Sequence, residues 1–96
     1  MEPLSRGELD AVSPLFKKMA DENSIQVVSI RPDVLSLTGA SDDMVVTIHL
    51  RGKFFDFRKF LVGVGGMPSL KRIEEIEIRQ ESGQKQFYLT VRLAIG

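Results

Sequence analysis

The residue best suited to acid–base chemistry in this 96-residue chain is its single histidine, His49. It lies in a stretch that alternates between apolar and polar residues, beside Thr47 and Arg51, which predicts a place on the outward face of a β-strand. A general base needs an orienting carboxylate and a nucleophile within hydrogen-bond reach, and the neighbouring sequence suggests neither. We therefore expect His49 to be a solvated or interface residue, and we predict no catalytic residues.

Two groups of acidic residues suggest a metal site by composition but not by spacing. The first group is Asp42 and Asp43, and the second is Glu74, Glu75, Glu77 and Glu81. Adjacent acids in a turn lack the spaced oxygen ligands of calcium and magnesium sites. Strand geometry places neighbouring glutamates on opposite faces, so the second group indicates an exposed sheet edge. Because the chain also has no cysteine, we predict no metal site and no cofactor.

The glycine-rich segment Gly63-Val64-Gly65-Gly66 does not have the context of a phosphate-binding loop. Such loops lie between a strand and the helix that follows it. Here the glycines follow residues with helical spacing, which favours the end of a helix or close backbone packing.

The composition is that of a soluble globular domain, with 43% hydrophobic and 27% charged residues. Lysine plus arginine and aspartate plus glutamate both number 13, so the net charge is zero. This balance argues against general nucleic-acid binding and against attachment to an anionic membrane surface. No apolar run approaches the ~20 residues of a membrane-spanning helix, and no signal-peptide pattern precedes residue 8.

Residues 8–51 predict one helix followed by two strands. Apolar residues at helical spacing from residue 9 to residue 19 indicate an amphipathic helix. Ser13 and Pro14 have the pattern of a cap and a first helical residue, so the helix either spans 13–23 or bends at Pro14. β-Branched residues predict a strand at 25–31, and alternation predicts another at 44–51. The connection is 33–42, with a turn at 39–42.

Residues 54–95 predict the same order again. Asp56 is the expected cap of a second helix, whose apolar stripe is Phe57, Phe60, Leu61 and Val64, and Pro68 prevents its continuation. Ile73, Ile76 and Ile78 then anchor a charge-rich third strand. A turn at 81–84 leads to the cleanly alternating fourth strand, 87–95.

These elements predict one α+β domain over residues 1–96, a ferredoxin-like two-layer sandwich with an antiparallel sheet and both helices on one face. The charged third strand suits an edge and the fourth suits the centre, giving the order third, fourth, second, first. The αββαββ order is that of a circularly permuted ferredoxin-like fold.

Six residues are candidates for contact with a partner protein. Val45, Thr47, Tyr88 and Thr90 lie on the predicted open face of the sheet, and Phe54 and Phe55 precede the second helix. The alternative is that they are ordinary scattered surface residues.

The segment from Gly52 to Ile73 resembles the PilO family of type IV pilus machines. The similarity is a strand that ends in glycine and an aromatic residue, an Asp-capped helix with Phe60-Leu61, and a proline-containing loop that enters a strand. The segment Leu4–Arg31 is also similar, and the type II secretion protein GspM has the same arrangement. Two departures are a longer Pro68 loop and the lack of the family's N-terminal membrane helix and coiled coil.

This resemblance implies a non-enzymatic assembly component of an inner-membrane platform. It implies a domain that faces the periplasm, anchored through a missing N-terminal segment. The implied partners are a second copy and a similarly folded protein of the PilN or GspL type, with no nucleic acid.

Three other classes of function make different demands on the chain. A small-molecule sensor domain would need a pocket at a strand-to-helix loop, such as 52–56 or 32–42. An acylphosphatase would need a phosphate-binding loop between its first strand and first helix, and this chain opens with a helix. A single-stranded RNA platform would need several aromatic residues on the open sheet face, where only Tyr88 is predicted.

Overall fold

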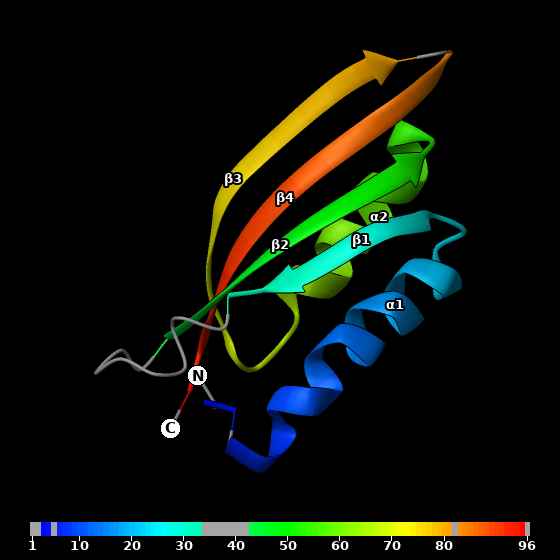
Figure 1. Ribbon diagram of the computed structural model, residues 1–96. Helices are drawn as coiled ribbons and strands as arrows, with labels where there is room; N and C mark the ends of the chain where they lie inside the picture. The colour runs from blue at the N-terminus through cyan, green and yellow to red at the C-terminus, as the bar shows by residue number, and fades with distance from the viewer. Residues whose placement is uncertain (1–2, 5, 34–42, 82, 96) are drawn as a thin grey trace.

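The computed structural model describes residues 3–4, 6–33, 43–81 and 83–95. In these residues, one four-stranded sheet carries two α-helices on a single face (Figure 1). We call this the helix face and the opposite one the open face. The connection predicted at 33–42 lies outside the described residues apart from Asp33, and so does its turn.

The elements follow the predicted order. The first unit comprises the 3-10 helix η1 (Arg6–Ala11), α1 (Val12–Glu22), β1 (Gln26–Pro32) and β2 (Asp43–Gly52). The second comprises α2 (Phe54–Gly65), β3 (Leu70–Glu81) and β4 (Gln84–Ala94). The sheet order is β1-β2-β4-β3 with antiparallel pairing throughout, as predicted. The α+β class is confirmed, and the arrangement is consistent with a ferredoxin-like sandwich.

The core lies between the two central strands and the helices. The alternation predicted for β2 is confirmed, because Met44, Val46, Ile48 and Leu50 are all buried. Their partners in β4 are the equally buried Leu93, Val91, Leu89 and Phe87. From α2, Phe57 stacks on Phe87 with ring centroids 4.1 Å apart, and the centroids of Phe60 and Phe16 of α1 are 6.5 Å apart. Aromatic pairs thus connect α2 to both the sheet and α1.

The predicted N-cap of α1 was wrong by two residues. The α-helix begins at Val12 directly after η1, with Ala11 at the N-cap position, so Ser13 is not the cap. Pro14 is the third helical residue. It is still tolerated because the N–H groups of the first turn have no partner inside the helix.

The end of α1 matches the predicted boundary at Asn23 and Ser24 and has a definite geometry. Ser24 adopts a left-handed conformation with φ 59°. Its N–H donates to the carbonyl of Asp21, and the N–H of Ile25 donates to the carbonyl of Ala20. This is a Schellman motif with serine at the position that glycine usually occupies. Ile25, predicted to start the strand, is instead the buried residue that closes this motif.

The predicted cap of α2 was also wrong. The N-cap residue is Lys53, whose backbone is extended, and its carbonyl accepts the first helical hydrogen bond from Phe57. Asp56 lies inside the first turn, where its charge still favours the positive end of the helix dipole. Phe54 and Phe55 are therefore the first two residues of the helix rather than residues that precede it.

The predicted role of the glycines is confirmed: α2 ends at Gly65, and Gly66 follows as its C-cap. Gly63 lies inside α2, where a Cβ atom would come within 3.1 Å of Met19 Cε. A small residue there lets α2 approach α1.

Candidate interaction surfaces

His49 lies on the open face, as predicted, among groups that cannot activate it. Its Nε2 is 2.8 Å from Gln86 Oε1, and its ring stacks on Tyr88 at 4.3 Å. Arg79 lies over the same Tyr88 ring, 5.0 Å from its centroid. An amide oxygen and a phenol ring orient the imidazole, and no carboxylate is among these contacts. This geometry fits a structural or contact residue better than a general base.

The four open-face residues expected to contact a partner form one patch. Thr47 lies directly opposite Thr90, and Val45 and Tyr88 occupy neighbouring positions on the same two strands. Thr47 is exposed and the other three are half-buried. The patch therefore exists as a surface, and its contact with a partner stays a prediction.

Phe54 and Phe55 do not belong to that patch. They lie in the helix layer at the start of α2, with 48% and 64% of their surface exposed. The ammonium of Lys85 lies 5.5 Å from the Phe54 ring, and that of Lys59 lies 5.2 Å from the Phe55 ring. The six candidate residues thus fall on two separate surfaces.

A network of charged side chains joins three strands at one end of the open face. Asp43, in β2, accepts hydrogen bonds from Lys71 at 3.0 Å and from Arg92 at 3.3 Å. Arg92 also bonds to Glu74, which pairs with Arg72 at 2.9 Å. The network explains Asp43 without a metal ion, while Asp42 lies outside the described residues.

The basic partners change the acidity of both carboxyl groups. Hydrogen bonds from Lys71, with further help from Arg92, hold the pKa of Asp43 below its ordinary value. Hydrogen bonds from Arg92 and then Arg72 lower the pKa of Glu74 in the same way. The ionised form of each carboxyl group therefore stabilises the folded state more than the protonated form does.

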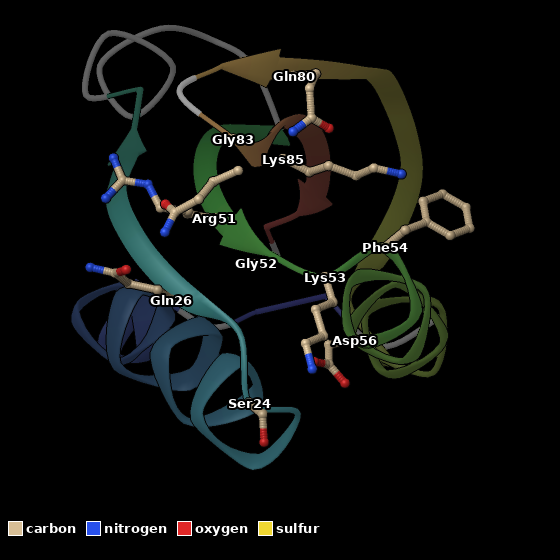
Figure 2. A pocket seen from close by; sticks show the side chains of 11 residues that line it. Ser24, Gln26, Arg51, Gly52, Lys53, Phe54, Asp56, Gln80, Gly83 and Lys85 are labelled. Carbon is tan, nitrogen blue, oxygen red and sulfur yellow. The ribbon is translucent and has the colours of Figure 1, made fainter.

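A hollow of about 740 Å³ lies at the end of the sheet near the start of α2. Gly52, Lys53, Phe54 and Asp56 line part of it, so it falls at one of the loops predicted for a sensor pocket. Two of its basic side chains, Lys85 and Arg51, do not converge, however. Figure 2 shows Lys85 extending toward Phe54, while Arg51 points to the other side of the opening. A built small-molecule site would aim several polar groups at one volume.

The sequence reasoning missed an apolar feature of β3. Ile76 and Ile78 were expected to anchor this strand, and their partners Leu89 and Phe87 are fully buried on the helix face. Both isoleucines are nevertheless 45–46% exposed. The spacing of these residues predicted that they anchor the strand, but it gave no information on whether a helix covers them.

Metal-binding clusters and membrane-spanning helices are both absent from the described part of the chain. There, no group of three histidine, cysteine, aspartate or glutamate side chains is arranged to hold a metal ion. In the same residues, no helix has the length and hydropathy needed to cross a membrane.

Comparison with known proteins gives structural matches only. No family model matches the sequence, and no curated protein resembles it significantly. The type 4 fimbrial biogenesis protein PilO from Pseudomonas aeruginosa superposes with a TM-score of 0.73 at 13% identity, over 90% of this chain and 67% of that one. A protein from Akkermansia muciniphila superposes with a TM-score of 0.69 at 20% identity, over 90% of this chain and 49% of its own length. The resemblance to PilO noted in the sequence is therefore confirmed as a shared fold, which spans nine-tenths of this chain.

Proposed function

We propose that the chain is an assembly component of an inner-membrane platform that builds type IV pili or drives type II secretion. The single observation that carries this proposal is the fold shared with a fimbrial biogenesis protein over 90% of the chain. The sequence resemblance between Gly52 and Ile73 supports it independently of the superposition. Proteins that share a fold can have many different functions, so the proposal also rests on the side chains that the surfaces expose.

The surfaces favour binding over catalysis. The one histidine is held by an amide and a ring, and the charged network at Asp43 pairs acids with bases. Neither arrangement supplies a nucleophile with an adjacent base. We propose a non-enzymatic protein whose domain faces the periplasm and belongs to a longer, membrane-anchored chain.

We further propose that the domain works by pairing with itself and with a similarly folded protein of the PilN or GspL type. Two kinds of surface support pairing: the patch at Thr47 and Thr90, and the exposed apolar side chains along α2 and β3. Exposed apolar groups that lie close together are typical of interaction sites.

Deletion of the gene tests this function. We expect a deletion strain to lose assembled surface pili, or to retain secreted enzymes in its periplasm, and the complete gene supplied on a plasmid should restore the lost process. A strain that assembles pili and secretes normally without the gene would refute the proposal.

A small-molecule sensor is a second candidate because the hollow lies at the loop predicted for it. Titration of the purified domain with inorganic phosphate and citrate, followed by amide NMR shifts of Lys53 and Gly83, tests it. Saturable shifts at micromolar concentration would favour the sensor. Unchanged spectra at millimolar concentration would reject the site for these anions.

A further inference from the structure

The two edges of the sheet are unequal. On β1, the register shifts between Val27 and Ser29, and the strand ends in Pro32, so a bulge and a proline interrupt that edge. On β3, register shifts occur only before Glu75, and pairing with β4 is then continuous to Glu81. Bulges and prolines discourage strand pairing between molecules. The second half of β3 lacks both.

This half of β3 also carries uncovered apolar side chains. Ile76 and Ile78 lie on the helix face, yet each exposes nearly half of its surface. Figure 1 shows the cause, because α1 and α2 lie toward the β1 side of the sheet and β3 forms the far edge. An added strand beside β3 would extend the sheet and place new apolar neighbours against both isoleucines.

The charges on the open face of the same segment are self-complementary. Glu75, Glu77 and Arg79 share that face, opposite Thr90, Tyr88 and Gln86 of β4. Antiparallel pairing of β3 with a second β3, centred on residue 77, would place Glu75 of each copy opposite Arg79 of the other. It would also place Ile76 opposite Ile78 twice. The one like-charged pair, between the two copies of Glu77, would lie next to both arginines, and Arg79 already bonds to Glu77 at 2.9 Å.

We propose that β3 of one molecule pairs antiparallel with β3 of a second copy, with Glu77 on the two-fold axis, to form a continuous eight-stranded sheet. The inference rests on the proposed function, which includes self-pairing, and it specifies the surface and the register. A second copy is the favoured partner because the charges of this segment complement each other in an antiparallel pair and because this part of the edge has no bulge or proline.

Charge reversal at two positions tests both surface and register. In sedimentation equilibrium, we expect the wild-type chain to dimerise and Glu75→Arg or Arg79→Glu to weaken dimerisation at least tenfold, about 1.4 kcal/mol. Each variant creates two like-charged pairs in its own dimer. An equimolar mixture of the two should associate at least as tightly as wild type, because every pairing of position 75 with position 79 then joins opposite charges. The double variant should also recover dimerisation.

Glu22→Arg is the control matched to Glu75→Arg, because it makes the same change of charge at an exposed site on α1. It should leave the association unchanged. Circular dichroism of each variant shows that the fold is retained.

Several results would overturn the inference. A wild-type chain that stays monomeric at millimolar concentration would reject the pairing. A dimer insensitive to both reversals would place the second copy elsewhere, and tighter association of Glu75→Arg alone would reject the register. In each of these cases, loss of pili or secretion in the deletion strain would still support the proposed function. Failure of the β3 pairing can therefore be distinguished from failure of the proposed function.

Discussion

Replacement of Phe57 by alanine should destabilise the domain far more than replacement of Phe55, two residues away. Phe57 is 1% exposed and stacks on Phe87, whereas Phe55 is 64% exposed and has the ammonium of Lys59 near its ring. The pair tests the rotation of α2 about its axis, which determines which side chains lie in the core.

The two magnitudes follow from burial. Phe57→Ala removes a fully buried ring and leaves a cavity, which costs about 3–5 kcal/mol. Part of this loss, ~0.5–1.5 kcal/mol, is the stacking interaction with Phe87, whose ring centroid lies 4.1 Å away. Phe55→Ala loses a solvent-exposed contact with a lysine, worth at most ~1 kcal/mol. The difference between the variants should therefore be at least about 2 kcal/mol.

Urea unfolding followed by circular dichroism measures both values. Small domains have only ~5–15 kcal/mol of stability, so Phe57→Leu, expected to cost roughly 1–2 kcal/mol, should be measured beside the alanine variant. The slope of the transition should stay unchanged if the native state is intact. Equal losses from Phe55→Ala and Phe57→Ala would show that α2 is rotated from the orientation described here.

Two further predictions concern the helix end and the charged network. Ser24→Gly should raise the unfolding free energy by about 0.5–1 kcal/mol, since glycine adopts the left-handed conformation without strain. The control Ser29→Gly, in the extended β1, should lower the unfolding free energy. A lower unfolding free energy for Ser24→Gly would contradict the Schellman geometry. Because its folded-state pKa is below the ordinary 3.8, Asp43 contributes stability above that value and loses it as the pH falls through the folded pKa. Asp43→Asn should thus lower the unfolding free energy at pH 7, and the unfolding free energy of the variant should fall less steeply than that of the wild type below about pH 4, as measured by urea titrations. If the two proteins lose stability equally with acid, Asp43 makes no such contribution.

The sheet could be predicted from the sequence because strand alternation is a direct record of burial. Met44, Val46, Ile48 and Leu50 all face the core, and the charge density of β3 marked an edge. The same reasoning identified the buried stripe of α2, in which Phe57, Phe60 and Val64 are inaccessible.

Helix starts were less predictable because the cap signals were local and the structure used others. Asp56 has the chemistry of a cap, but Gly52 ends β2 so close to α2 that Lys53 alone connects them. Ser13 was displaced as a cap by η1, which leads directly into α1. In both cases the neighbouring element determined where the helix begins.

The candidate surfaces were predicted only in part. The positions of Thr47 and Thr90 followed from alternation, and their adjacency follows from the strand order. The exposure of Ile76 and Ile78 could not be predicted in the same way, because it depends on how far the helices extend across the sheet. The face on which a side chain lies depends on a single strand, whereas whether a helix covers that side chain depends on the packing of the whole sandwich.

The most direct test of the central claim is piliation and secretion in a deletion strain that expresses either the wild-type gene or its His49→Gln variant. If the chain acts by assembly rather than catalysis, both should restore pili or secretion to the same extent. Restoration by the wild type but not by a stably expressed His49→Gln variant that still folds and self-associates like the wild type would contradict that claim. Normal pili and secretion without the gene would refute the proposed function itself.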